Sequence, residues 1–496
     1  MHQLPYELYT AEQTRELDRI VSAQHAIPAA MLMARAGAAA LETINNHWPE
    51  ARDILVICGC GNNGGDGYEL ARQALNKDYR VTVIEVGKLD KMSTETFAAR
   101  AALLATGTDT QSFDGSLTDA DVIVDALFGT GLDREISGTY AQAITVINQV
   151  NNTPVLSLDI PSGIHADSGQ VLGIAVKATV TISFIGLNIG LFNGEAPDFT
   201  GDICFDTLAV PAAIYTVVPP LARRIDLNHN AKTVLAPRQR TAHKGSHGHL
   251  LIIGGEHGMT GAPRIAAEAG ARVGAGLISI ATRRDHSALL NLSRPELMCH
   301  GVEDLTELRA LTTVASVISI GPGLGQTQWS EALLHQAIET RLPLVVDADA
   351  LNLLSLQPQK NDHWILTPHP GEAARLLSCS STDIQANRVD AVKQLQERYG
   401  GIVVLKGANT LIYSGNGPVF LSTWGNPGMA SGGMGDALAG IIGGLLAQQL
   451  NLIDAACIGV VLHGMAADKA AEQDGERGML AMDLMPHLRR LANLRY

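Results

Sequence analysis

The chain has 496 residues, of which 46% are hydrophobic and 17% charged, with a formal net charge of −14. This length exceeds one ordinary domain, and the apolar content is sufficient for two buried cores, so a disordered chain is excluded. The negative charge excludes an electrostatic nucleic-acid binder, because phosphate contacts require clustered Lys and Arg.

The first predicted helix begins after Thr10, which forms a capping-box pattern with Gln13, and runs to about Gln24. The residues before it lack the pattern of a signal peptide, and no apolar run approaches a membrane span. We therefore expect a cytoplasmic protein with small-molecule partners, no nucleic acid and no membrane.

From Asp53 onward, apolar runs alternate with helical stretches. Continuous apolar strands separated by helices predict a parallel sheet covered on both faces. The N-terminal half is therefore predicted to be an α/β domain of the Rossmann-like, doubly wound type. The expected strands are DILVICG, VTVIEVG, DVIVDALFG, PVLSLDIPSG and KATVTISFIG, with helices starting near Tyr68, Ser93 and Thr139.

A second series of apolar runs follows a polar stretch at 223–232, so we place the boundary within 212–232 and expect domains over 1–215 and 225–496. The runs TLIYS and PVFLS flank Gly415-Asn-Gly417, which predicts a hairpin and makes the second sheet mixed. The other expected strands are HLLIIGG, LISIAT, SVISIGPG, LPLVVDADAL, HWILTPHPGE and GIVVLKG.

A glycine-rich segment, residues 59–67, lies between a predicted strand and a predicted helix. It contains the pattern GxGxxG, and Glu85 at the end of the next strand could hold a ribose, as in dinucleotide-binding dehydrogenases. Against that interpretation, the carboxylate of Asp66 would repel the pyrophosphate that such a loop cradles.

Oxygen-bearing side chains follow two further strands of the same half, at Asp125, Asp159 and Ser162. Side chains of this kind at one sheet edge could bind a hard cation, which prefers oxygen ligands. The alternative is that these residues only build the turns after the strands.

The motifs GxGNNGGDG, DALFGTGL and DIPSG, in this order over residues 1–215, resemble the NAD(P)H-hydrate epimerase family. The resemblance implies a potassium ion bound by Asn63, Asp125 and Ser162, and it makes Asp159 a substrate contact and our candidate for proton handling. The residues implied to bind the hydrated nucleotide are Asn62, Asn63, Gly64, Gly65, Asp66, Gly129, Thr130, Gly131, Leu132, Asp133, Arg134 and Glu135.

A second glycine-rich segment, Gly425 to Asp436, precedes an apolar helix rich in small residues. Its backbone amides and the helix N-terminus predict an anion site. Asp436 beside that site is poised to take a proton from a hydroxyl that attacks a phosphoryl group. The alternative is a glycine-rich helix entry with Asp436 as the N-cap.

The KGxxT motif is weak by itself but becomes specific after GPGLG, DADAL and TPHPGE. From about residue 225 to the end, the chain resembles the ribokinase-like ADP-dependent NAD(P)H-hydrate dehydratases. The residues implied to bind nucleotide are Lys406, Gly407, Ala408, Asn409, Thr410 and Gly435, and those implied to face the hydrate are Ala262, Gly323, His369 and Asp436.

The order of the two domains resembles the bifunctional NAD(P)H-hydrate repair enzymes across nearly the whole chain. The resemblance implies epimerisation of R and S forms of NADHX and NADPHX, and dehydration of the S form at the expense of ADP. It also implies a potassium ion in the first domain and a magnesium ion with ADP in the second, and we expect a homo-oligomer. The alternative is a ribokinase-like small-molecule kinase with a nucleotide-binding N-terminal module.

Overall fold

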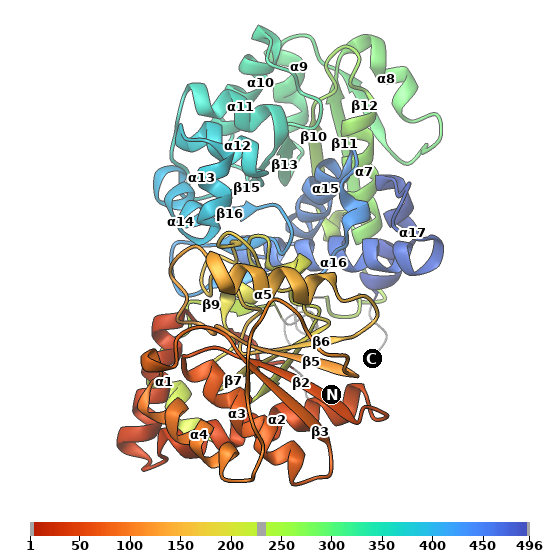
Figure 1. The fold of residues 1–496 in the computed structure, drawn as a ribbon. Helices are drawn as coiled ribbons and strands as arrows, with labels where there is room; N and C mark the ends of the chain where they lie inside the picture. The colour runs from red at the N-terminus through yellow and green to blue at the C-terminus, as the bar shows by residue number, and fades with distance from the viewer. Residues whose placement is uncertain (1–3, 226–234, 494–496) are drawn as a thin grey trace. The chain divides into compact units, whose positions relative to one another are not determined.

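The computed structural model describes residues 4–225 and 235–493 (Figure 1). The chain divides into two compact units, Met1–Arg223 and Arg224–Tyr496. Part of the expected polar linker, 226–232, lies outside the described residues. Within the described ranges, no helix combines the length and the hydropathy needed to cross a membrane.

Unit 1, Met1–Arg223, is built on a seven-stranded sheet in which every neighbouring pair of strands is parallel. Strand β2 (Asp53–Cys58) places Cys58 opposite Ala126 of the central strand β5 (Val122–Ala126), so these two strands end at the same sheet edge. The expected doubly wound sheet is therefore confirmed. In spatial order the strands are β4 (Gln111–Ser112), β3 (Arg80–Glu85), β2 (Asp53–Cys58), β5 (Val122–Ala126), β6 (Val155–Leu158), β7 (Val180–Phe184) and β8 (Asp202–Asp206). Outside this sheet, β1 (Glu7–Leu8) pairs antiparallel with β9 (Ala222–Arg224).

Alternation along β2 divides the core of unit 1 between the two faces of the sheet. Ile54 and Val56 pack with residues of the first four helices, whereas Leu55 and Ile57 pack with residues of α5. The helices of unit 1 are α1 (Ala11–Gln24), α2 (Ala29–His47), α3 (Asn62–Leu75), α4 (Thr94–Leu104) and α5 (Gly138–Gln149).

Unit 1 differs from the sequence-based expectation at its edge strands β4 and β8, which were not expected, and at two helices. Helix α3 begins at Asn62 rather than near Tyr68, so the glycine-rich segment forms its first turns. The helix contains glycine here because of close packing: a Cβ on Gly64 would stand 2.0 Å from the carbonyl oxygen of Gly59. Helix α2, which starts after Pro28, was not expected at all.

Unit 2, Arg224–Tyr496, contains a mixed sheet, as expected from the hairpin. The hairpin strands β17 and β18 pair antiparallel with each other, and β17 pairs antiparallel with β16, while the remaining neighbours are parallel. Strand β12 is an edge strand that the sequence did not predict. In spatial order the strands are β18 (Val419–Leu421), β17 (Leu411–Tyr413), β16 (Ile402–Leu405), β15 (Trp364–Leu366), β14 (Leu344–Val346), β13 (Val317–Ile320), β10 (His249–Ile253), β11 (Leu277–Thr282) and β12 (Met298–Gly301).

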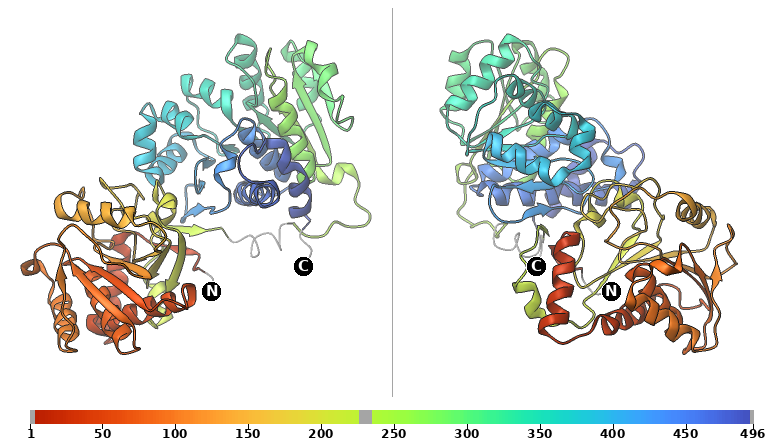
Figure 2. Two further views of the ribbon diagram at one scale, coloured as in Figure 1. Left: turned by 45° about the vertical axis from the view of Figure 1, so that its right-hand side comes forward. Right: turned by 60° about the vertical axis from the view of Figure 1, so that its left-hand side comes forward.

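Helices cover both faces of this sheet (Figures 1 and 2). Helix α15 lies against α7 so closely that a Cβ on Gly440 would stand 1.9 Å from the carbonyl oxygen of Ala266. The small residues of α15 therefore fix where its N-terminal turn lies. The helices of unit 2 are α7 (Gly261–Val273), α8 (Arg284–Leu290), α9 (Leu305–Thr312), α10 (Gln328–Glu339), α11 (Ala348–Leu356), α12 (Pro370–Leu377), α13 (Ser381–Ala386), α14 (Arg388–Tyr399), α15 (Met434–Ala447), α16 (Leu452–Asp474) and α17 (Met485–Leu491).

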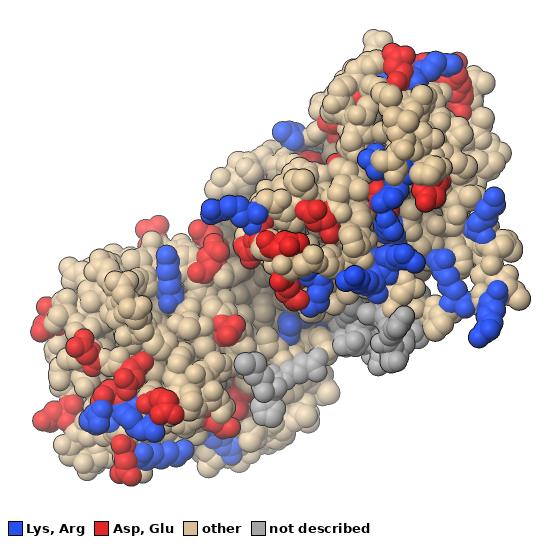
Figure 3. Space-filling model, turned by 90° about the vertical axis from the view of Figure 1, so that its right-hand side faces the viewer, with Lys and Arg blue, Asp and Glu red and all other residues tan. Residues whose placement is uncertain are grey.

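Acidic and basic side chains are interspersed on the face of the molecule drawn in Figure 3. Large uncharged areas separate many of them, and several Lys and Arg side chains gather near the middle of the view.

Candidate functional sites

Unit 1 contains a cavity of about 880 Å³. Residues that follow β2, β5 and β6 line it, as expected for the carboxyl ends of strands in an open α/β sheet. The volume suits a cofactor-sized ligand. Most of the predicted substrate contacts are among the lining residues, namely Asn62, Asn63, Asp66, Gly129, Thr130, Gly131, Leu132, Asp133, Arg134 and Asp159.

The three predicted potassium ligands differ in their hydrogen bonding. Asp125 is fully buried and accepts hydrogen bonds from the Ser162 hydroxyl (2.6 Å), the Ser162 amide (2.9 Å) and the Ser157 hydroxyl (2.8 Å). Asn63 is not hydrogen-bonded to this pair and lies beside Gly129. Burial raises the pKa of Asp125, and the hydrogen bonds from Ser162 and Ser157 oppose that rise.

The amide group of Asn63 is the strongest sign of a ligand in this region. It is 6% exposed, and neither its oxygen nor its nitrogen has a hydrogen-bond partner among the described residues. Buried polar groups are normally satisfied, so an orphaned oxygen at a cavity wall indicates a missing partner. The Asn63 oxygen is of the type that ligates a hard cation, whereas its NH2 group requires a hydrogen-bond acceptor.

Asp159 occupies the turn after β6 with a left-handed backbone, φ 67°. Its carboxylate accepts a hydrogen bond from the Thr130 amide (2.9 Å). A Cβ on Gly129 would stand 2.6 Å from the same carboxylate oxygen, so any side chain at this position would displace the carboxylate. Burial raises the pKa of Asp159, and the hydrogen bonds from Thr130 oppose that rise.

Two further carboxyl groups line the cavity. Burial and then the charge of Asp159 raise the pKa of Asp18, on α1, to about 7. Burial, Asp159, Asp18 and Glu69 raise the pKa of Asp66 well above its ordinary value. Several acids in one poorly hydrated space cannot all ionise together, so the cavity retains protons near neutral pH.

Glu85 does not take the role that a dehydrogenase would give it. It is buried, ion-paired with Arg100 and hydrogen-bonded by the Tyr68 hydroxyl (2.9 Å). Its carboxylate is therefore committed to the protein interior rather than to a ribose.

The second site lies in unit 2 around Lys406, which follows β16. Its ammonium group is 2.6 Å from Asp347 and 3.7 Å from Glu372. The pKa of Lys406 is lowered by burial but raised more by these two carboxylates, so it remains a cation. A Cβ on Gly435 would stand 3.3 Å from the ammonium nitrogen, so Lys406 faces the glycine-rich segment.

Asp436 lies within the first turn of α15, whose N-cap is Gly433 with φ 90°. The alternative in which Asp436 is itself the N-cap is therefore wrong, because the left-handed glycine ends the loop three residues earlier. Burial and then the charge of Asp347 raise the pKa of Asp436 to about 7, while Lys406 opposes that rise. Such a pKa suits a general base at neutral pH.

The remaining predicted residues of unit 2 fall around the same end of the sheet. Gly323 packs against Ala262, since a Cβ on Gly323 would stand 3.2 Å from that of Ala262. His369 caps α12 by accepting a hydrogen bond from the Gly371 amide (3.0 Å). Its pKa is lowered by burial and by Lys406.

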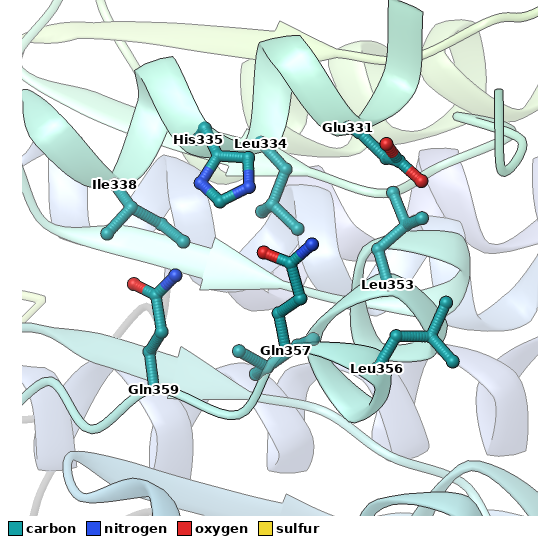
Figure 4. Close-up of a pocket in the computed structure, with 9 residues that line it drawn as sticks. Glu331, Leu334, His335, Ile338, Leu353, Leu356, Gln357 and Gln359 are labelled. Atoms are coloured by element: carbon teal, nitrogen blue, oxygen red, sulfur yellow. The ribbon is translucent and has the colours of Figure 1, made fainter. Parts of the chain in front are cut away.

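A much smaller pocket of about 30 Å³ lies between α10 and α11 (Figure 4). Its walls include Leu334, Leu353, His335 and Gln357. It has room for about one water molecule and contains no residue that the motifs singled out.

Sequence reasoning missed one wall of the first cavity and the acidic partners of Lys406. Arg15, Asp18 and Ser22 line the cavity from one face of α1, with the spacing of three and four residues that places side chains on one face of a helix. That spacing could have indicated them. No local pattern joins Asp347 or Glu372 to Lys406, because these residues meet only through the sheet order.

Comparison with known proteins gives separate matches in the two units. The family described as YjeF-related protein N-terminus matches residues 29–190, and the family described as NAD(P)H-hydrate dehydratase matches residues 250–490. A solved ribokinase-like superfamily protein from Enterococcus faecalis V583 is 30% identical, with a TM-score of 0.51, over 55% of this chain and 95% of that one. This likeness confirms the ribokinase-like fold of the C-terminal part.

Relatives of full length contain both parts. A bifunctional NAD(P)H-hydrate repair enzyme from Coxiella burnetii is 48% identical over 98% of this chain and 99% of its own. The protein of the same description from Escherichia coli K12 is 42% identical over 99% and 95%. The chain therefore belongs to the family of bifunctional NAD(P)H-hydrate repair enzymes.

Proposed function

We propose that unit 1 interconverts the R and S forms of NADHX and NADPHX, and that unit 2 dehydrates the S form to NADH or NADPH while ADP becomes AMP and phosphate. The observation that carries the proposal is the position of Asp436, a carboxylate with a pKa of about 7, beside a cation and a glycine-rich helix entry. We assign the two activities to residues 1–215 and 225–496.

In dehydration, Asp436 takes the proton of the ring hydroxyl as that oxygen attacks the terminal phosphoryl group of ADP. The bond between the two phosphates breaks, and AMP leaves. The lone pair of the ring nitrogen then expels inorganic phosphate, and loss of a proton from the adjacent ring carbon restores the dihydropyridine. Lys406 and the amides at the start of α15 stabilise the phosphoryl charge.

In epimerisation, a bond at the carbon that bears the hydroxyl group breaks and forms again, and Asp159 gives and takes back the proton that this exchange requires. Burial raises the pKa of this carboxyl group, so it binds a proton more tightly than an exposed carboxyl group does. Thr130 fixes its orientation through the backbone amide. The walls of the cavity hold the remainder of the dinucleotide and exclude bulk water.

Two ions complete the proposal. Asn63, Asp125 and Ser162 would hold a potassium ion, which supplies a fixed positive charge beside the substrate. Magnesium would enter unit 2 with the nucleotide, since Mg²⁺ is commonly held through substrate phosphates. The described residues contain no cluster of three His, Cys, Asp or Glu side chains suited to a metal ion. A cytoplasmic location and a homo-oligomer stay predictions.

The decisive experiment incubates the purified chain with separated R and S NADHX, with ADP, with ATP or with neither. We expect absorbance of regenerated NADH from the S form only when nucleotide is present, together with release of inorganic phosphate. The R form should be consumed at a rate limited by its conversion to S. A phosphorylated product that persists without NADH would indicate the small-molecule kinase instead.

A further inference from the structure

Arg388, the first residue of α14, packs against the KGxxT segment, Lys406 to Thr410. It is 2% exposed, although arginine is seldom so deeply buried. Its guanidinium group donates hydrogen bonds to the carbonyl oxygens of consecutive or nearly consecutive residues. These acceptors are Leu405 (3.4 Å), Lys406 (3.4 Å), Ala408 (2.6 Å) and Asn409 (3.3 Å).

The segment bends around this guanidinium group at Gly407. Its φ of 146° lies in a region that side chains disfavour, and a Cβ there would stand 2.8 Å from a terminal nitrogen of Arg388. The glycine is therefore required both by the backbone conformation and by the closeness of the arginine.

Carbonyl groups that point toward Arg388 determine the direction of the neighbouring amides. In a planar trans peptide the C=O and N–H groups point in opposite directions. The amides of Gly407, Asn409 and Thr410 therefore point away from Arg388, on the side from which an anionic ligand would approach them.

We infer that Arg388 is a positioning residue for the nucleotide: it holds the carbonyl groups of the KGxxT segment inward so that its amides and Lys406 are presented to phosphate. The inference rests on the proposed function, because it takes this segment as the nucleotide site. Only a planar fork with five donors can serve acceptors spread over five residues, whereas a lysine offers three donors from one point. Burial lowers the pKa of Arg388 only to about 10, so the group stays charged at neutral pH.

The test compares Arg388→Lys and Arg388→Gln with the full-length chain. We expect ADP affinity, measured by calorimetry, to fall about tenfold to a hundredfold, because buried carbonyl groups lose their donors and the segment relaxes. The KM for ADP should rise accordingly, with kcat and the KM for the hydrate little changed. Arg398→Lys is the matched control, because Arg398 lies on the same helix, is exposed and packs on the Tyr399 ring.

A purely structural role would lower the active fraction, and therefore kcat, without changing ADP affinity, and that result would overturn the inference. Unaltered ADP affinity in both Arg388 variants would also overturn the inference, whatever happens to kcat. If the substitutions prevent folding, the test moves to Arg388→Ala prepared with guanidinium ion at low concentration, which should restore ADP affinity in this variant and leave that of Arg398→Ala unchanged. A folded Arg388→Ala variant whose ADP affinity does not respond to guanidinium ion would overturn the inference. Failure of the wild-type chain to dehydrate the hydrate would remove the proposed function alone, since ADP binding is measured separately.

Discussion

The pKa values of carboxyl groups are raised in both sites, but in different ways. In unit 1, burial raises the pKa values of Asp18 and Asp66 most, and the charges of neighbouring carboxylates raise them further. In unit 2, Lys406 stands among the acids and holds the pKa of Asp436 down to about 7. The difference matches the ligands that we propose, because a transferring phosphate needs a cation, whereas breaking and remaking a bond at the hydroxylated ring carbon needs a group that gives and takes a proton.

The largest expected effect is that of Asp436→Asn on dehydration. The substitution keeps size and hydrogen bonding but removes the base, which commonly costs about 10²–10⁴ in rate. Turnover of S NADHX should fall by that factor, while ADP affinity and epimerisation by unit 1 stay close to wild type. Near-normal turnover by a folded variant would contradict the phosphoryl-transfer mechanism.

A comparable loss is expected in the other unit from Asp159→Asn. Asn tolerates the left-handed backbone at this position, so the fold should persist while proton handling is lost. Interconversion of the epimers, followed by chromatography, should fall at least about a hundredfold, with dehydration of the S form intact. Equal loss of both activities would show that the two sites are not independent.

Replacement of Lys406 by Met sharpens the contrast between the sites. Loss of the cation should weaken ADP binding about tenfold. Because Lys406 lowers the pKa of Asp436, its removal should raise that pKa. A base works in its ionised form, so the wild-type rate should increase as pH rises through about 7, and the variant should require higher pH. An unshifted pH profile of kcat/KM would contradict an effect of Lys406 on the pKa of Asp436.

The smallest effect concerns the cation of unit 1. Potassium should support epimerisation better than lithium, since the smaller ion demands a tighter oxygen shell than Asn63 and its neighbours offer. Dehydration of the S form, assayed with the same salts, is the internal control. Equal epimerisation after thorough removal of potassium would contradict a required potassium site.

Element type was predictable from the sequence wherever an apolar run was long and bounded by turn residues. The central strands and the hairpin at Gly415–Gly417 are confirmed for that reason. The start of α3 was misplaced because glycine has a low helix propensity, so the glycine-rich segment was expected to be a loop. In the structure Gly64 approaches Gly59 so closely that only glycine fits at this position of the helix. Tertiary packing decided that boundary.

Motif residues were also predictable, but their partners were not. Asp125 lies in β5 and Ser162 follows the next strand, β6, 37 residues later. They could be paired by expecting strand ends to meet at one sheet edge. The pairing of Lys406 with Asp347 depends on the order of β14, β15 and β16 in the sheet. No spacing in the sequence encodes that order, so the charge environment of Asp436 had to come from the structure.

The left-handed backbone at Asp159 has a cost outside catalysis. A non-glycine residue in this conformation gives up about 1 kcal/mol or more of folding free energy, which Asp159→Gly would recover. Laboratory evolution toward heat resistance, without a selection for epimerisation, should therefore enrich this substitution and discard the activity. On the proposed role of Asp159, the backbone conformation that destabilises the fold at this residue is the one that the activity requires.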